Sequence, residues 1–521
     1  MVERMSEIEE VKGNVLSSYG RVRVFEGFPY YYYEISPRTL DSKGAKIKKT
    51  LEEVLLRRAP LSDVSKALEK SLSETAFNSI RAITGKIENQ ALVDTLPGPE
   101  KIEELKKMLS EFLQKYSELE NPEDFAQGVL ESCIGFGVLS ELTEDQNLEE
   151  IMVNSKDSIF VFHRSFGMCK TNLKLQKEED LLAIVSKIAK RVGKSFDSNN
   201  PLLDARLPDG NRANATYAPA TPFGITLTIR KFKKEPLTVI DLIANNTLSS
   251  EVAAFLWAMV EGLDVEPMNM IVTGGASTGK TTTLNCLAQF MNYRNRVVTI
   301  EDTLELQLGN RENWIQMEAR MKTVESREVT MDDLLKNALR MRPDRILVGE
   351  VRGGEAQTMF VAMDTGHRGM MGTVHANNAK ETLIRLKSEP MSVPESMLPL
   401  LDLIVVQYRQ YVKDKGMIRR ISQVAEISRM DEKVLLSNIF EWDRSNDLVK
   451  KTDVPARVLE TLAERAGITK KELMREIAVR QKILEWMLEN NIREQAEVEK
   501  IIQGYYFNPK YILEKITKGI F

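Results

Sequence analysis

The residues with the most specific chemistry lie in one glycine-rich stretch, Gly274-Gly275-Ala276-Ser277-Thr278-Gly279-Lys280-Thr281-Thr282. Its first eight residues match the phosphate-binding pattern G-x-x-x-x-G-K-[ST]. Glycines let the backbone curl, so that successive N–H groups can point at phosphate oxygens. The lysine of this pattern reaches the outer phosphates of a nucleotide, and the hydroxyl that follows it ligates Mg²⁺. We therefore predict that all nine residues bind a nucleotide, ATP, together with Mg²⁺.

The segments on either side of this stretch are the ones a phosphate loop requires. Residues 270–273 form a short apolar run that is typical of a buried strand, and residues 282–290 carry apolar side chains at helical spacing. The amino end of a helix adds partial positive charge beside a bound phosphate. Strand, loop and helix in this order argue against an accidental match by a glycine-rich turn.

Three more apolar runs end in side chains suited to phosphoryl transfer. Residues 297–300 lead into Glu301, Asp302 and Glu305, residues 346–348 lead into Glu350, and residues 370–374 lead into His375. In doubly wound sheets, ligands bind outside the carboxyl ends of the strands, so these side chains should share an edge with the phosphate loop. Hydrolysis of ATP requires carboxylates that activate water and hold Mg²⁺, and a polar group near the outer phosphate. One such residue alone would suggest a helix cap. Three strand ends that carry such side chains, together with a phosphate loop, predict a catalytic site.

Three arginines surround a turn earlier in the chain. Arg206 and Arg212 flank the turn-forming sequence Pro208-Asp209-Gly210, and a strand-like run ends at Arg230. Converging arginines are what an anion clamp needs. Ordinary surface charge explains the same pattern, and the pattern alone leaves both explanations open.

Composition restricts the class of protein. A chain of 521 residues, 42% of them hydrophobic, can form roughly three to four domains of ~150 residues each. The formal charge of -4 is near neutral for this length, so the charge balance does not call for a nucleic-acid partner. The three cysteines form no C-x-x-C pair, and the neighbouring histidines His367 and His375 have no soft ligand near them, so we expect no zinc site.

Neither a signal peptide nor an apolar run of about 20 residues is present, and we therefore expect a cytoplasmic protein without direct membrane insertion.

The pattern along the chain predicts five segments. They are a helical N-terminal domain with an aromatic edge segment (1–124), an α+β domain bearing the arginines (125–232), a hinge linker (233–248), an α/β core with a mostly parallel sheet (249–430) and a mainly helical C-terminal subdomain (431–521). In the first segment, the aromatic residues between Phe25 and Tyr33 suggest either a docking surface or an edge strand packed on its own domain. The second explanation is favoured.

Taken together, these motifs resemble the secretion ATPase superfamily, the motors of type II secretion, type IV pili, archaella and type IV secretion. The resemblance covers roughly residues 125–430 and includes four signatures in the family's order. Residues 274–281 are similar to its Walker A loop, 298–305 to its aspartate box, 342–352 to its atypical Walker B segment and 365–375 to its histidine box. The chain lacks the four-cysteine zinc module of many bacterial type II members. This absence and the aromatic N-terminal segment make it most similar to archaeal members.

The resemblance implies a RecA-like P-loop NTPase core and a role for each site residue. Lys280 and Thr281 would bind phosphate and Mg²⁺, with Glu350 positioning the metal and the water. Arg206, Arg212 and Arg230 would clamp phosphate when their domain moves onto the nucleotide. Glu301 would activate the water, and Asp302 and Glu305 are the next candidates for that role. His375 would sense the γ-phosphate.

The same resemblance implies partners. A homohexamer would act on a polytopic membrane platform protein at the inner face of the cytoplasmic membrane, and through it on pilin-like subunits. No nucleic-acid partner is expected. Two alternatives stay open: a DNA-translocating motor of a conjugation-type system, and a nucleotide-gated assembly scaffold without turnover.

Overall fold

The computed structural model describes residues 11–36, 99–116, 122–133, 135–207, 209–232, 236–320, 327–412, 416–430 and 433–518. The chain divides into two compact units, residues 1–233 and residues 234–521. Residues 37–98 of the predicted helical N-terminal domain lie outside the described residues, as does Pro208 of the predicted turn.

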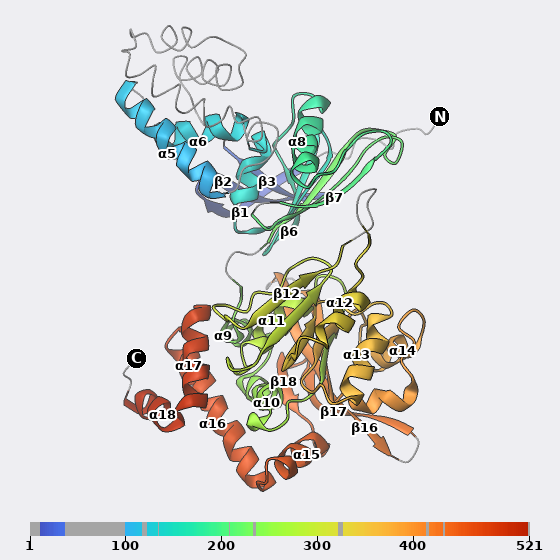
Figure 1. Ribbon diagram of the computed structural model, residues 1–521. Helices are drawn as coiled ribbons and strands as arrows, with labels where there is room; N and C mark the ends of the chain where they lie inside the picture. Colours follow the sequence, from blue (N-terminus) through green and yellow to red (C-terminus); the bar gives the residue numbers. More distant parts are fainter. Residues whose placement is uncertain are drawn as a thin grey trace. The chain divides into compact units, whose positions relative to one another are not determined.

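The first unit is built on one nine-stranded sheet in the order β1-β2-β3-β6-β5-β4-β9-β8-β7 (Figure 1). All neighbouring strands are antiparallel except β3 and β6, which are parallel. Its strands are β1 (Val11–Tyr19), β2 (Val22–Phe28), β3 (Tyr31–Ile35), β4 (Leu148–Ser155), β5 (Ser158–His163), β6 (Gly167–Thr171), β7 (Leu202–Arg206), β8 (Arg212–Thr216) and β9 (Thr226–Arg230). Its helices are α5 (Pro99–Tyr116), α6 (Pro122–Cys133), η1 (Gly137–Leu139), α7 (Ser140–Glu144) and α8 (Glu178–Arg191).

The aromatic N-terminal segment belongs to this sheet. Strand β3 lies inside the sheet between β2 and β6, and the edge position is taken by β1. Tyr33 is 1% exposed, and its hydroxyl donates a 2.5 Å hydrogen bond to Asp145 Oδ2, which also accepts one of 2.8 Å from Tyr19. The segment is therefore packed on its own unit, and it shares a sheet with strands that the sequence pattern assigned to the next domain.

The second unit is built on another nine-stranded sheet, in the order β12-β11-β13-β14-β10-β15-β16-β17-β18. The six strands from β12 to β15 are parallel, and the last three are antiparallel. Its strands are β10 (Met270–Gly274), β11 (Val297–Glu301), β12 (Trp314–Glu318), β13 (Arg345–Val348), β14 (Met371–Val374), β15 (Leu403–Val412), β16 (Gly416–Met430), β17 (Lys433–Asp443) and β18 (Leu448–Lys451).

Helices cover both faces of this second sheet. Along β10, Met270 and Val272 pack into one hydrophobic cluster and Ile271 packs into the other. A strand that is buried on both faces reads as a continuous apolar run, as these strands do. The helices are α9 (Val239–Ala244), α10 (Ser250–Glu261), η2 (Gly262–Asp264), α11 (Lys280–Ala288), α12 (Met331–Ala338), α13 (Glu355–Asp364), α14 (Ala379–Lys387), η3 (Glu395–Leu400), α15 (Arg457–Arg465), α16 (Lys470–Glu489), α17 (Gln495–Phe507) and α18 (Pro509–Lys518). The predicted α/β fold class with a mostly parallel core sheet is confirmed.

Part of the expected hinge is helical. Residues 239–244 form α9, which Thr238 caps by accepting a hydrogen bond from the Asp241 N–H. Its side chains Val239 and Ile240 are fully buried in the core of the second unit. Only the residues before Thr238 are left to connect the two units.

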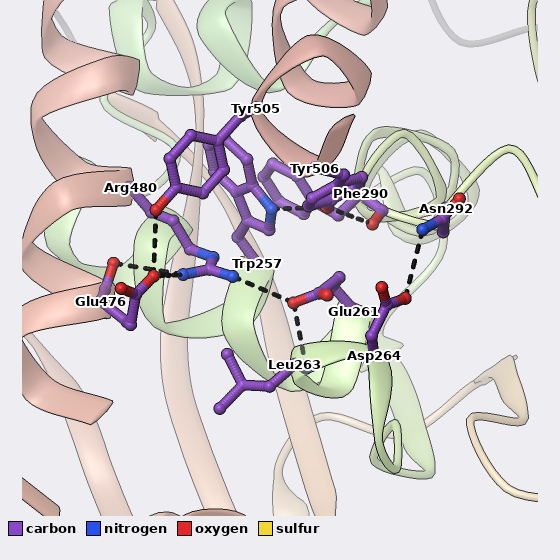
Figure 2. Close-up of polar contacts among 10 residues, drawn as sticks. All are labelled: Trp257, Glu261, Leu263, Asp264, Phe290, Asn292, Glu476, Arg480, Tyr505 and Tyr506. Carbon is purple, nitrogen blue, oxygen red and sulfur yellow. Dashed lines mark hydrogen bonds and ion pairs between the residues drawn. The ribbon is translucent and has the colours of Figure 1, made fainter. Parts of the chain in front are cut away.

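The C-terminal helices are held against the core by a buried polar cluster (Figure 2). Arg480 on α16 pairs with Glu261 on α10 at 3.0 Å, and the two side chains are 4% and 5% exposed. Trp257 Nε1 donates a 2.6 Å hydrogen bond to the Tyr506 hydroxyl, which in turn donates one of 2.6 Å to the Phe290 carbonyl oxygen. These contacts make α16 and α17 part of the core rather than an appended tail.

None of the helices in the described ranges combines the length and apolar character that crossing a bilayer requires.

Candidate nucleotide site

The glycine-rich stretch forms the connection between β10 and α11. A Cβ on Gly274 would lie 2.5 Å from the Gln407 carbonyl oxygen and from Thr278 Oγ1, so only glycine fits there. Gly279 has a φ of 99° at the start of α11, in the left-handed region that glycine tolerates best. The glycines of the pattern are therefore required by the backbone path itself.

Lys280 is the first residue of α11. Its Nζ donates a 2.9 Å hydrogen bond to the Gly275 carbonyl oxygen, and Thr278 Oγ1 donates one of 3.0 Å to the same atom. The ammonium is thereby held against the loop backbone, at a helix end that is itself electropositive. Thr281 follows in the first turn of the same helix.

Glu301 ends β11 and is almost completely buried, with 1% of its surface exposed. Its Oε2 accepts hydrogen bonds from the backbone N–H groups of Glu305 (2.7 Å) and Leu306 (2.9 Å), while its Oε1 has no partner in the described part of the chain. Burial raises the pKa of this carboxyl to about 7, against the lowering effect of the two backbone bonds. Glu301 therefore fixes the turn after β11, and its role in activating water stays a prediction.

The acidic groups around Glu301 differ in their surroundings. A Cβ on Gly349 would lie 2.9 Å from Glu301 Cγ, so the strand end before Glu350 requires glycine. Asp302 is ion-paired with Arg352, which follows β13. Glu350 is half-buried and follows β13 directly after Gly349.

His375 is the point where several predicted residues meet. Burial lowers the pKa of its imidazole, as do the charges of Lys280 and Arg385, while the charge of Glu350 raises it. Both β10 and β13 pair with β14 in parallel, so the loop after β10, Glu350 after β13 and His375 after β14 follow the same edge of the sheet. The carboxyl edge of the sheet thus brings together the lysine of the loop, one strand-terminal carboxylate and the histidine.

Hydrogen bonds join the phosphate loop strand to the histidine segment. Thr273 Oγ1 on β10 donates to the carbonyl oxygens of Val374 (3.0 Å) and Ala376 (3.2 Å). Thr382 on α14 donates to Thr273 Oγ1 at 3.1 Å. A shift of the loop strand would therefore be transmitted to the backbone beside His375.

Sequence reasoning missed three residues at this edge. Arg385 Nη1 donates a 2.5 Å hydrogen bond to the His375 carbonyl oxygen, and Arg419 Nε donates one of 3.4 Å to the Ser277 carbonyl oxygen. Gln407 accepts a hydrogen bond of 2.9 Å from Thr283. Arg419 and Gln407 come from the β15–β16 hairpin, far along the chain, and no local pattern marks them.

The three predicted arginines form one row in the first unit. Arg206 lies opposite Arg212 in the β7–β8 pair, and Arg212 lies opposite Arg230 in the β8–β9 pair. Side chains that are directly opposite on neighbouring strands extend from the same face. The row therefore presents three cationic groups side by side, which costs stability unless acidic groups or a bound anion lie close by.

Acidic side chains neutralise part of the positive charge of this row of arginines. Arg212 makes two hydrogen bonds with Asp204, Nε to Oδ1 at 3.1 Å and Nη2 to Oδ2 at 2.8 Å. Glu150 lies opposite Arg230 in the β4–β9 pair. Because the arginines belong to the first unit and the phosphate loop to the second, their role as a phosphate clamp stays a prediction.

The oxygen donors at the loop suit Mg²⁺. Hydroxyl and carboxylate oxygens, combined with substrate phosphates, are the ligands that Mg²⁺ prefers, and Thr281 and Glu350 supply them. Within the described ranges, no cluster of three or more His, Cys, Asp or Glu side chains is arranged to hold a metal by itself.

Comparison with known proteins gives a consistent result. A family model described as type II/IV secretion system protein matches residues 134–434. An uncharacterized protein of Methanocaldococcus jannaschii is 30% identical over 92% of this chain and 90% of its own length. The conjugal transfer protein TrbB of Rhizobium radiobacter is 27% identical over 54% of this chain and 85% of its own length.

A third relative has also been solved as a structure. The type IV secretion system protein VirB11 of Brucella suis is 30% identical over 54% of this chain and 86% of its own length. The crystal structure of this VirB11 ATPase, in complex with sulphate, aligns with a TM-score of 0.29, at 27% identity over 55% of this chain and 92% of that chain. The family match covers more than half of the chain, including the phosphate loop and every strand-terminal site residue. The chain therefore belongs to the type II/IV secretion system protein family.

Proposed function

We propose that this protein hydrolyses ATP in the presence of Mg²⁺. The observation that carries the proposal is that β10, β13 and β14 are parallel neighbours, so that the phosphate loop, Glu350 and His375 follow the same edge of the core sheet. The phosphate loop supplies backbone N–H groups and an ammonium for the phosphates, Glu350 a carboxylate for the metal and the water, and His375 a polar contact for the outer phosphate. Bound Mg²⁺, held by Thr281 and Glu350, would neutralise charge on the phosphate oxygens.

We further propose that the protein works as a homohexamer. In this arrangement, Arg206, Arg212 and Arg230 clamp the phosphates when the first unit moves onto the second. Hydrolysis then drives a polytopic platform protein at the inner face of the cytoplasmic membrane, which assembles or exports pilin-like subunits. The row of arginines across β7, β8 and β9 supports this view, because such a cationic surface is well suited to a phosphate chain.

Two single substitutions test the catalytic proposal. Lys280→Ala and Glu350→Gln should each lower steady-state ATP hydrolysis by at least roughly a hundredfold, because each removes a group that contacts developing charge. The control is Glu489→Gln, which makes the same chemical change as Glu350→Gln at an exposed position near the end of α16. Phosphate release is measured on the purified full chain, with circular dichroism to verify folding. Unchanged turnover in folded Glu350→Gln protein would refute the proposed site.

The similarity to the conjugal transfer protein TrbB favours a second candidate, a motor that moves DNA. Hydrolysis rates with and without double-stranded DNA separate the two. A DNA-driven motor should be stimulated several-fold, whereas a platform motor should respond to membranes containing its partner instead. Absence of turnover even with those membranes would favour a nucleotide-gated scaffold.

A further inference from the structure

The hairpin of β15 and β16 continues past the phosphate loop. Strand β10 ends at Gly274, which is paired with Gln407 of β15. Beyond that pair, β15 runs on to Val412 and stays paired with β16 along its whole length. This part of the hairpin therefore lies beyond the carboxyl end of β10, where the phosphate loop starts.

Contacts with the loop and with α11 show which face of the hairpin meets them. Gln407 Oε1 accepts a 2.9 Å hydrogen bond from Thr283 of α11. Arg419 Nε donates a hydrogen bond of 3.4 Å to the Ser277 carbonyl oxygen. Arg419 Cδ also lies 3.5 Å from the position that a Cβ on Gly279 would take. The side chain of Arg419 is therefore packed against the phosphate loop.

A second arginine lies directly opposite the first. In the β15–β16 pair, Arg409 is the partner of Arg419. Side chains that are directly opposite on neighbouring antiparallel strands extend from the same face, with Cβ atoms about 5 Å apart. Both arginines are half-buried, and no carboxylate in the described ranges forms an ion pair with Arg409. Two guanidinium groups thus extend from the hairpin face that meets the phosphate loop.

Like charges in this arrangement are unfavourable, and a negative group between them removes that cost. Guanidinium groups bind phosphate oxygens well, because their N–H donors form a planar fork that permits bidentate hydrogen bonds. The ligand of a phosphate loop is itself a chain of phosphates. The two arginines are therefore placed where a bound nucleotide would supply their counter-charge.

The order of strands in the sheet indicates which phosphates the hairpin can reach. Strand β10 lies between β14 and β15, so the hairpin is on one side of the phosphate loop and the strands that lead to Glu350 and His375 are on the other. Those two residues belong to the proposed chemistry at the outermost phosphate. An approach from the opposite side leads to the phosphates that stay attached to the nucleoside after hydrolysis.

We propose that Arg409 and Arg419 bind the α- and β-phosphates of the nucleotide, and that they contribute equally to the affinity for ATP and for ADP. This proposal rests on the proposed ATP hydrolysis and adds two ligands from a distant hairpin to its site. Contacts that are the same before and after the reaction increase affinity without favouring the transition state.

Equilibrium binding to the purified full chain tests this assignment. The probes are fluorescent N-methylanthraniloyl derivatives of ADP and of adenylyl imidodiphosphate, an ATP analogue that is not hydrolysed, each with Mg²⁺. Arg409→Gln and Arg419→Gln should each raise the Kd of both nucleotides by roughly tenfold, because each removes a charge-assisted contact with phosphate. The control is Arg429→Gln, the same change at an exposed position near the other end of β16, and it should bind like the parent.

Melting without nucleotide separates a ligand from a support of the fold. Arg419 contacts the loop backbone, so its replacement alone does not make this distinction. Arg409→Gln does, because it removes one charge of a like-charged pair. Without nucleotide, this variant should unfold at the same temperature as the parent or at a higher one.

The possible failures are distinguishable. If the parent binds neither nucleotide, both this assignment and the proposed ATP hydrolysis are wrong. If the parent binds both and the two arginine variants bind as tightly, only the assignment of the arginines is wrong. A loss confined to the ATP analogue would move them to the outermost phosphate and overturn the proposal. A lower melting temperature of nucleotide-free Arg409→Gln would overturn it too, because that arginine would then support the fold.

Discussion

Replacing Glu301 by glutamine should stabilise the second unit, and this gain should appear only as the pH rises above 4.5 toward about 7. Both hydrogen bonds from the loop go to one oxygen, Oε2, and the other oxygen is buried without a partner in the described ranges. The amide of Glu301→Gln can keep its oxygen in the accepting position and place its NH₂ at the unpartnered position. The variant therefore preserves the turn and removes a buried charge.

The size of the effect follows from the pKa of this carboxyl, which burial raises from 4.5 to about 7. The folded state then binds a proton more tightly than the unfolded state. The contribution of this carboxyl to the free energy of unfolding is fully present below about pH 4.5. It declines as the pH rises toward about 7, and above that pH it no longer changes. A difference of about 2.5 in pKa, at about 1.4 kcal/mol per unit, corresponds to about 3 kcal/mol.

Fluorescence can follow this unit alone, because all four tryptophans belong to it: Trp257, Trp314, Trp442 and Trp486. At pH 8 the melting temperature of Glu301→Gln should exceed that of the parent by roughly 6 °C, and at pH 4.5 the two should nearly coincide. The control is Glu489→Gln, which makes the same chemical change at an exposed position at the end of α16. A difference between Glu301→Gln and the parent that does not change with pH would refute the reasoning. ATP hydrolysis by the same variant tests catalysis separately, since loss of turnover with gain of stability would assign Glu301 to the reaction.

Two further substitutions test how the core is held together. Arg480→Met should destabilise the second unit by about 3 to 5 kcal/mol, because it leaves Glu261 buried and unpaired. Combining Arg480→Met with Glu261→Leu should recover most of that loss, as a double-mutant cycle measured by urea unfolding would show. Equal losses in the single and the double variant would contradict the ion-pair explanation. Gly349→Ala should cost about 1 to 3 kcal/mol in thermal unfolding, because its new methyl group would lie 2.9 Å from Glu301 Cγ, while Gly354→Ala, with no atom within 4 Å of its Cβ, should be nearly neutral.

Much of the candidate nucleotide site could be predicted because its signals are local. The phosphate loop pattern specifies a backbone path that only certain residues can adopt, as Gly274 and Gly279 show. Apolar runs that end in polar residues identify strand ends, and the parallel arrangement then puts those ends at one edge. For this reason, the sequence alone predicts that Glu350 and His375 follow the same sheet edge, and the parallel pairing of β13 with β14 agrees with that prediction.

Pairing between distant segments could not be predicted, because no local pattern encodes it. The aromatic strand β3 pairs with β6 across more than a hundred residues, and Asp145 accepts the hydroxyl that fixes it. Arg419 reaches the phosphate loop from a hairpin near the end of the core sheet.

The same contrast applies to charge. The sequence by itself determined which residues carry charge and which strand ends present them. Only the tertiary structure decided that Glu301 is buried in a turn and that Arg480 is buried beside Glu261, since burial and pairing arise when distant segments pack together.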